Sequence, residues 1–300
     1  MIVKINHLRR ASDRTWKALI GVSQKEFDAL LPLFSSAWQT FLMTKPNRKR
    51  KPGAGIKGIL PGNVEKLFFA LMYLKAYPTF DVMGFIWGTD KTRAHKWTHK
   101  LLPILKNSLH ISGNLPKRKI TSVEEFFRLF PEIKDVFVDG TERPTQKPKS
   151  QKRRQKLYSG KKKGTMRKNI VMNDEKRRIL YLSKTHSGRR HDKRLADKDH
   201  LARAIPDDVT AWTDTGFQGF DRIHPNTQMP KKATKHNPLT EADKQNNKVI
   251  SGIRILAEHT IGGMKRLKAA TDIYRNRIPN MDDLFMELSA GIWNFHLAQG

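Results

Sequence analysis

The sequence predicts a mixed α/β domain that follows a helical region. Up to about residue 115, apolar residues recur at helical spacing, whereas from residue 132 short apolar runs alternate with helical segments. The order of the second part is strand, hairpin, helix, strand and helix, which is typical of a sheet with mixed strand directions. We therefore expect an all-α domain over residues 1–115, a connector over 116–131 and an α/β domain over 132–300.

Local signals place the first helices. Ser23 begins a helix with Glu26 three residues later, which is the spacing of a capping box. The segment 45–62 is basic and rich in Gly and Pro, which predicts a loop. Asn63 is expected to cap a helix that runs to Ala76, because apolar residues recur along it every three or four positions.

A helix-turn-helix is predicted near residues 79–107. Thr79 caps a short helix that ends at Trp87, a turn follows, and a second helix runs from Lys91 to about Lys106. A recognition helix needs an apolar side for its own module and a cationic side for the DNA groove and the phosphates. The alternative is an ordinary basic surface helix. The candidate DNA-binding residues on the polar face are Lys91, Arg93, Lys96 and Lys100, together with His95 and His99.

The elements of the α/β domain follow from short β-branched and aromatic runs bounded by turn residues. They are a strand at 133–138, a hairpin of 169–172 with 179–183, a helix at 193–204, a strand at 209–213, and helices at 247–268 and 281–297. A short helix from Val123 is expected in the connector and ends near Pro131. Residues 219–246 are polar and Pro-rich, which indicates an irregular insertion.

The charge of the chain indicates a polyanionic partner. There are 58 Lys and Arg residues against 28 Asp and Glu residues in 300, a formal net charge of +30. DNA or RNA is the first candidate and an anionic membrane surface the second. No apolar run approaches the roughly 18 to 20 residues that span a bilayer, so the membrane alternative is weak. With no cysteine, disulfides and Cys-ligated zinc are excluded, and a cytoplasmic protein is expected.

Three carboxylates are placed as in a metal-dependent nuclease. Asp139 and Asp214 each follow an apolar run that predicts a strand, and Glu258 lies in a helical pattern. Carboxylate oxygens on rigid elements suit Mg²⁺ and two-metal phosphoryl transfer. The alternatives are that both aspartates belong to turns, since each is close to Gly, and that Glu258 forms a surface salt bridge with Arg254. In the nuclease interpretation, Arg254 and Lys265, which are expected on the same helix face as Glu258, would contact phosphates.

A basic block follows the first of these acids. Residues 145–169 contain eleven Lys or Arg residues and no acid. Such blocks are usually solvated, but this one is placed to bring a DNA backbone to bound metals. Tyr158 within it is expected either to stack on a base or to pack on the sheet. The pair His191-Asp192 suggests a base or a metal ligand, or else a helix cap. The DNA-binding candidates of the block are Lys152, Arg153, Arg154, Lys161, Lys162 and Lys163.

In their order and combination these motifs resemble a known family. The motifs are Val138-Asp-Gly-Thr-Glu-Arg-Pro144, Tyr158-Ser-Gly-Lys-Lys-Lys163, Gly188 with His191-Asp192, Thr213-Asp-Thr-Gly-Phe217, and Arg254 with Glu258 and Lys265. With the helix-turn-helix after Pro78-Thr79, nearly the whole chain resembles the DDE transposases of bacterial insertion sequences, in the branch related to Harbinger-type elements. Two positions depart from the family pattern: Ser251 stands where Tyr is frequent, and Gly164 where His is common.

The resemblance implies a fold and an activity. It implies a ribonuclease H-like catalytic domain in which Asp139, Asp214 and Glu258 hold two Mg²⁺ or Mn²⁺ ions. It also implies excision of an element at its terminal inverted repeats and transesterification of the 3′ ends into target DNA, without a covalent protein intermediate or ATP. Because two ends must be brought together, a homodimer on double-stranded DNA is expected. The alternatives are a catalytically inactive, domesticated DNA-binding protein and a basic nucleic-acid-binding protein whose acids are structural.

Overall fold

The computed structural model describes residues 9–44 and 58–300, so most of the loop predicted at 45–62 lies outside the described residues. The chain forms two compact units. The helical unit contains residues up to 115 together with 264–272 and 277–300. The sheet unit contains residues 116–263 and 273–276. None of the helices in the described part of the chain is both long and apolar enough to span a membrane.

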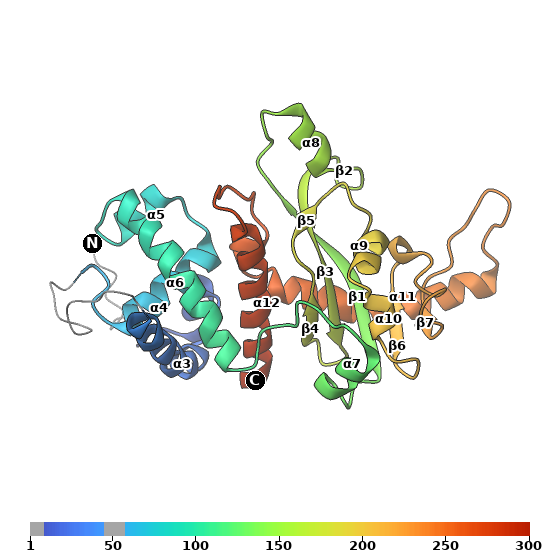
Figure 1. Cartoon of the computed structure of the whole chain (residues 1–300), viewed down its shortest axis with the longest axis horizontal. Helices are drawn as coiled ribbons and strands as arrows, with labels where there is room; N and C mark the ends of the chain where they lie inside the picture. The colour runs from blue at the N-terminus through green and yellow to red at the C-terminus, as the bar shows by residue number, and fades with distance from the viewer. Residues whose placement is uncertain (1–8, 45–57) are drawn as a thin grey trace. The chain divides into compact units, whose positions relative to one another are not determined.

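The helical unit is made of short and medium-length helices around an aromatic core. The helices are α2 (Asp13–Ile20), α3 (Gln24–Met43), α4 (Asn63–Ala76), α5 (Phe80–Ile86), α6 (Lys91–Ile111), the short 3-10 helix η2 (Lys268–Ala270) and α12 (Met281–Gln299) (Figure 1). Trp16, Phe27 and Phe68 pack together with ring centroids 5.2–6.4 Å apart. All three side chains are almost fully buried, so they anchor α2, α3 and α4 to one another.

Two helix starts test the predicted caps. The capping box at α3 is confirmed: Ser23 N donates to Glu26 Oε2 at 2.6 Å, and Glu26 N donates to Ser23 Oγ at 3.2 Å. The predicted cap of α4 is wrong by one residue. Gly62 occupies the cap position and Asn63 is already helical, because Glu65 accepts a hydrogen bond from the Gly62 amide at 2.9 Å and closes the turn.

The predicted pair of helices at 79–107 is present as α5 and α6. Thr79 Oγ1 caps α5 by accepting from Val82 N at 3.3 Å, and Asp90 Oδ1 caps α6 by accepting from Arg93 N at 2.9 Å. The second helix continues past the predicted end near residue 106 to Ile111. It does so because its buried stripe continues through Leu105 to Leu109.

The C-terminal helix α12 groups with the helical unit, whereas the sequence placed it in a catalytic domain over 132–300. Its long buried apolar run fits the core of a helical bundle, and chain order alone gave no sign of this. Asn294 Nδ2 donates to the Asn114 carbonyl at 3.0 Å, and Lys106 pairs with Glu287 at 2.9 Å. Gly291 allows close packing here, because a Cβ at this position would lie 2.7 Å from a Leu115 methyl carbon.

The sheet unit holds a mixed sheet with helices around it. Its elements are α7 (Val123–Leu129), β1 (Asp135–Pro144), α8 (Gln151–Leu157), β2 (Tyr158–Ser159), β3 (Gly164–Asp174), β4 (Ile179–Leu182), β5 (His186–Ser187), α9 (Asp192–Lys198), α10 (Leu201–Ala204), β6 (Thr210–Thr213), the short 3-10 helix η1 (Thr215–Phe217), β7 (Thr227–Gln228) and most of α11 (Glu241–Met264). The strand order is β2-β3-β1-β6-β7, and β4 and β5 also pair with β3. β1 runs antiparallel to β3 and parallel to β6, and β7 runs parallel to β6.

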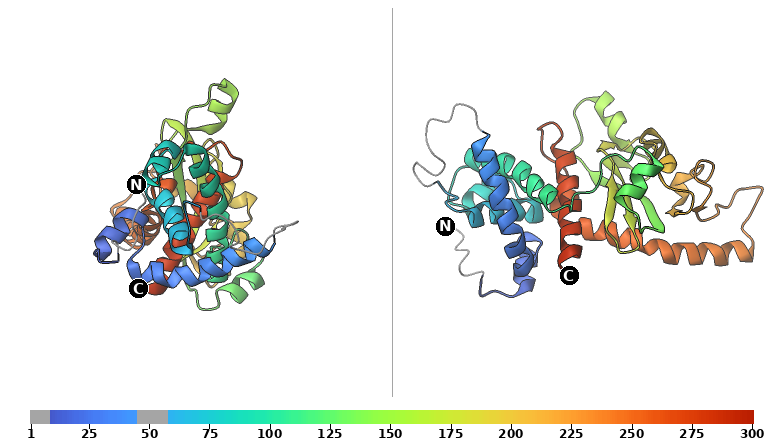
Figure 2. Two further views of the ribbon diagram at one scale, coloured as in Figure 1. Left: turned by 90° about the vertical axis from the view of Figure 1, so that its left-hand side faces the viewer. Right: turned by 60° about the horizontal axis from the view of Figure 1, so that its bottom comes forward.

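The predicted elements of this unit are largely confirmed, with shifted ends. The hairpin is present as β3 and β4, and β3 begins five residues earlier than predicted. The helix predicted at 193–204 is divided into α9 and α10, because His200 adopts a left-handed backbone with φ of 55°. The irregular insertion extends only to residue 240, since α11 already begins at Glu241 and ends at Met264 (Figure 2).

The connector is part of the core of the sheet unit. Phe126 on α7 is fully buried in the same apolar cluster as Val136 and Val138 of β1 and Leu195 of α9. Before α7, Lys117 forms backbone hydrogen bonds with Leu180 and Leu182, which lie on β4. Residues 116–131 therefore stabilise the sheet and do not form a separate linker.

Candidate active site

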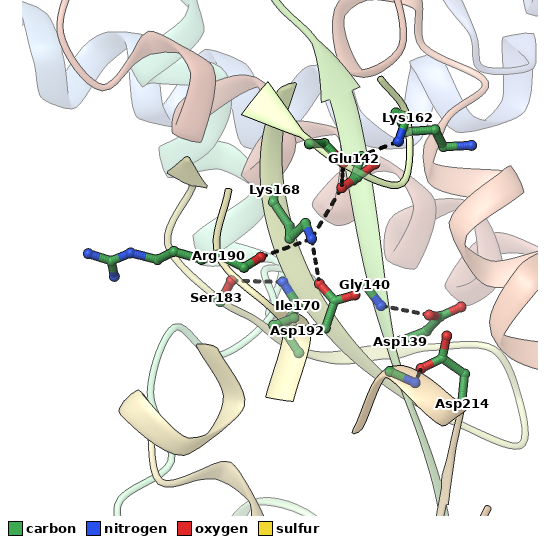
Figure 3. Close-up of polar contacts among 12 residues, drawn as sticks. Asp139, Gly140, Glu142, Lys162, Lys168, Ile170, Ser183, Arg190, Asp192 and Asp214 are labelled. Carbon is green, nitrogen blue, oxygen red and sulfur yellow. Dashed lines mark hydrogen bonds and ion pairs between the residues drawn. The ribbon is translucent and has the colours of Figure 1, made fainter. Parts of the chain in front are cut away.

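The sheet register places Asp139 next to Asp214. In the parallel pair of β1 and β6, Val138 is the partner of Thr213, and the two aspartates are the next residues on each strand. Parallel neighbours lie roughly 4.8 Å apart, so the two side chains start from adjacent backbone positions. Figure 3 draws their carboxylates close together, and the negative charge of Asp214 raises the pKa of Asp139. The structure thus brings together two of the three predicted carboxylates.

The prediction that Asp139 ends a strand is wrong. β1 continues to Pro144, because its polar second half pairs with the basic first half of β3. Asp214 does follow the end of β6, where it caps η1. Asp139 Oδ1 accepts from Gly140 N at 2.7 Å, and Asp214 Oδ1 accepts from Gly216 N at 2.8 Å. Neither Oδ2 atom has a hydrogen-bond partner among the residues that the structure describes.

The electrostatic state of Asp139 is that of an acid lacking a counter-ion. Burial and the negative charge of Asp214 raise the pKa of Asp139 to about 6. The Gly140 amide, Arg254 and Lys161 lower this pKa, but they do not offset the first two effects. A divalent cation between the two carboxylates would remove the repulsion and supply the missing charge.

Asp192 is a further carboxylate beside this pair. It is the first residue of α9, and its side chain fills the space above two glycines of the candidate site. A Cβ at Gly140 would lie 2.8 Å from Asp192 Cγ, and a Cβ at Gly216 would lie 3.6 Å from Asp192 Oδ2. The glycine after Asp139 is therefore needed for close packing, and the turn considered from the sequence is absent there.

Lys168 holds Asp192 in place from β3. Its Nζ lies 3.0 Å from Asp192 Oδ1 and 3.1 Å from Glu142 Oε1, and it donates to the Arg190 carbonyl at 3.0 Å (Figure 3). Glu142 is the cross-strand partner of Lys168 and also accepts from Ser159 Oγ at 2.8 Å. Burial alone would lower the pKa of Lys168, but Asp192 and Glu142 outweigh it, so the pKa is raised and the ammonium is retained.

Sequence reasoning missed this cluster. Lys168 belonged to a block of cations that was expected to bring a DNA backbone to bound metals, and nothing local distinguished it from its neighbours. Asp192 had been considered as a base, a metal ligand or a helix cap. The cap position belongs to His191, which makes no side-chain capping bond, and Asp192 forms an ion pair instead. No local signal marks the cluster, because Glu142 and Lys168 meet only through the register of β1 and β3.

Glu258 does not group with Asp139 and Asp214. It lies exposed on α11, one turn after Arg254, which is close enough to Asp139 to lower its pKa. Among the described residues, no three Asp, Glu or His side chains are grouped so that they could hold a metal ion. Lys265 is not on the predicted helix face, since α11 ends at Met264 after the pair Gly262-Gly263.

The donor set nevertheless fits a hard divalent cation. Asp139 and Asp214 offer oxygen ligands from two adjacent strands, and their mutual repulsion is left uncompensated. Arg254 and Lys161 are close enough to Asp139 to lower its pKa, so they could also help to neutralise a substrate phosphate. These groups could bind a metal, orient a phosphodiester and stabilise the charge that develops during its cleavage.

The predicted DNA contacts are distributed over both units. On α6, Lys91 is paired with Asp81 at 4.0 Å, Arg93 with Asp90 at 3.4 Å, and Lys100 lies over the Trp97 ring at 4.5 Å. In the sheet unit, α8 carries Lys152, Arg153 and Arg154, and the turn between β2 and β3 carries Lys161, Lys162 and Lys163. Five of these six cations are exposed, and Arg154 is half-buried.

A helical pair followed by an α/β unit with adjacent strand carboxylates defines a DNA-directed endonuclease class, and the comparisons with known proteins name the family. The model of the DDE superfamily endonucleases matches residues 138–292, and that of the helix-turn-helix of DDE superfamily endonucleases matches residues 64–111. The chain belongs to the DDE superfamily endonucleases. It is 28% identical, over 297 residues and 99% of both chains, to a probable transposase for the insertion sequence element IS702 of Microchaete diplosiphon. No solved structure matches the chain.

Proposed function

We propose that the protein is a metal-dependent DNA transposase that cleaves strands at terminal inverted repeats and joins the 3′ ends to target DNA. The observation that carries the proposal is the pair Asp139 and Asp214, adjacent through strand register and short of positive charge. Family membership and the similarity over nearly the full length to a probable transposase support it. Binding of the paired ends by a homodimer is part of the proposal, because the reaction needs two ends in one complex.

We also propose that the sheet unit is ribonuclease H-like. Its first strand lies inside the sheet, with antiparallel β3 and β4 on one side and parallel β6 and β7 on the other. In such a sheet, the first strand and its parallel neighbour carry Asp139 and Asp214 to one position. The order of strands and the placement of the acids support this assignment.

Asp139, Asp214 and Glu258 would hold two Mg²⁺ or Mn²⁺ ions. The ions would supply Lewis acidity and an activated water or 3′-hydroxyl. Asp139 and Asp214 would hold the metal beside the phosphodiester to be cleaved, and Arg254 and Lys161 would balance the phosphate charge. Support for Glu258 comes from its position one turn after Arg254 on α11, since residues four apart on a helix share a face.

DNA contacts would be divided between the two units. The α5–α6 pair belongs to a helix-turn-helix family and would read the element ends through Lys91, Arg93, Lys96 and Lys100. The basic residues of α8 and the β2–β3 turn would hold phosphates near the cleavage site.

Plasmid nicking tests the function. The plasmid carries DNA from both flanks of the gene, and wild type is compared with Asp214→Asn and with Asp208→Asn, an exposed aspartate elsewhere in the sheet unit. Nicking in Mg²⁺ or Mn²⁺ that is lost only in Asp214→Asn is the expected result. Tight DNA binding without nicking by the wild type in either metal would favour the alternative, a catalytically inactive sequence-specific DNA-binding protein.

A further inference from the structure

Two basic hollows lie on either side of α8 in the sheet unit. The first has a volume of about 950 Å³, the second about 660 Å³, and both are lined by Gln155 and Arg189, so they adjoin. None of the described residues that line them is acidic. Besides Arg189, the cations of the first are Lys147, Arg154 and Lys163, and those of the second are Lys152, Lys156, Arg190 and Arg194.

The second hollow is lined by residues that adjoin Asp192 in the chain. Arg190 and His191 line it, and the next residue is Asp192. The Arg190 carbonyl accepts the hydrogen bond from Lys168, which is paired with Asp192. A chain lying in the two hollows would therefore pass residues that adjoin Asp192, the carboxylate beside Asp139 and Asp214.

Tyr158 gives the first hollow an aromatic surface. It lines that hollow, and 48% of its surface is exposed. Its backbone pairs with Thr165 in the short β2–β3 ladder, so the strand is formed without burial of the ring. The sequence left open whether Tyr158 stacks on a base or packs on the sheet. Its backbone is part of the sheet, but its ring remains available to a ligand.

An exposed aromatic ring within a row of cations fits one class of ligand. Proteins that bind single-stranded nucleic acid combine a positively charged groove along the backbone with aromatic rings on which bases stack. A duplex offers phosphates, but the faces of its bases are hidden within the stack. Hollows of this size are comparable with ligand pockets of roughly 300–1,000 Å³, enough for a few nucleotides.

We propose that the two hollows form a track for a single DNA strand, with one base stacked on Tyr158 and the phosphates held by Arg154 and Arg189. The proposal rests on the proposed function and deepens it, because cleavage of one strand at the aspartates produces a strand end that can leave its complement and be held nearby. It assigns to Tyr158 a binding role that the catalytic acids do not share.

The test measures the binding of fluorescently labelled oligo(dT) and of a matched duplex to the full-length protein. Binding is monitored by fluorescence anisotropy in EDTA. Tyr158→Ala should weaken oligo(dT) binding about 5- to 100-fold, the loss of one stacked base, and leave the duplex affinity within about twofold. Tyr158→Phe should retain wild-type binding. Phe127→Ala, which removes another exposed aromatic ring of the sheet unit, is the matched control.

Equal losses on oligo(dT) and duplex, or wild-type oligo(dT) binding by Tyr158→Ala, would overturn the proposal. A second measurement uses the unaltered protein: oligonucleotides with 5-iododeoxyuridine are photo-crosslinked and the adducts are mapped. Adducts within 147–165 or 187–194 are expected, and adducts confined to 91–111 would refute the track. Both measurements omit divalent metal, so a failure of the cleavage proposal leaves them unchanged.

Discussion

Lys168 Nζ lies 3.0 Å from Asp192 Oδ1, and this buried ion pair connects the basic block to the candidate active site. The lysine side chain is 8% exposed and those of its two carboxylate partners are 9% and 16% exposed. Because the lysine is paired with both Glu142 and Asp192, the position of Asp192 beside the aspartate pair depends on it. Lys168 and Glu142 influence the candidate site through Asp192, which packs against Gly140 and Gly216.

Removal of the lysine should be strongly destabilising. Lys168→Met leaves two buried carboxylates without a cation, which typically costs about 3–5 kcal/mol. Urea unfolding at pH 7 measures the loss, and Lys176→Met, at an exposed lysine of the β3–β4 turn, is the control. A loss below about 1 kcal/mol in Lys168→Met would show that the cluster is open to water.

Gly140 is expected to tolerate no side chain while Asp192 is present. In Gly140→Ala the new Cβ would lie 2.8 Å from Asp192 Cγ, so the carboxylate must move away from Lys168. We expect a loss of about 1–3 kcal/mol in the free energy of unfolding. Gly252→Ala, on α11 with nothing within 4 Å, should instead gain up to about 1 kcal/mol through helix propensity.

A double variant separates this clash from a general effect of the methyl group. If Asp192 is the obstacle, Gly140→Ala should cost little in the background of Asp192→Ala, and the two changes should be strongly non-additive. Additive losses in the double-mutant cycle would place the cause elsewhere in β1.

The sequence predicted most elements of the sheet unit but only part of the site. Asp139 and Asp214 could be placed together in advance because each follows an apolar run that is visible locally, although β1 continues beyond Asp139 to Pro144. The polar half of β1 and the basic half of β3 have no apolar alternation, so their pairing through Glu142 and Lys168 was not visible. A lysine among ten other cations in its segment is buried because of a partner 26 positions away, and no local pattern carries that information.

The pKa of Asp139 predicts how stability depends on pH without metal. This pKa is about 6 in the folded state against an ordinary value of 3.8, so between these values the folded state binds more protons than the unfolded state. The free energy of unfolding should therefore fall as pH rises from about 4 to 6. Asp139→Asn removes this penalty and should be more stable than wild type at pH 8, by up to about 3 kcal/mol.

Urea unfolding in EDTA at pH 4 and pH 8 measures this effect. The advantage of Asp139→Asn should be present at pH 8 and absent at pH 4, and Asp208→Asn should follow wild type at both values. Added Mn²⁺ should stabilise wild type at pH 8 but not Asp139→Asn, because the cation takes over the charge of the pair. Parallel pH profiles for wild type and Asp139→Asn would show that the carboxyl is ionised normally.

Glu258 is the predicted ligand that lies outside the aspartate pair, and it provides the sharpest test of the two-metal proposal. Glu258→Gln keeps the size and helix propensity of an exposed side chain, so the fold and DNA binding should be unchanged. Loss of a metal ligand should lower strand cleavage by at least about 100-fold, a cost comparable to losing one group that stabilises the transition state.

The matched control is Glu241→Gln, an exposed glutamate at the start of the same helix. Cleavage of the flanking-DNA plasmid is measured over a range of Mn²⁺ concentrations, and DNA affinity is measured in parallel in EDTA. A rise in the Mn²⁺ concentration needed for half-maximal cleavage, together with unchanged DNA affinity, would assign Glu258 to the metal. Wild-type cleavage by Glu258→Gln at every Mn²⁺ concentration would remove it from the ligand set and leave Asp139 and Asp214 to bind the ions with another group.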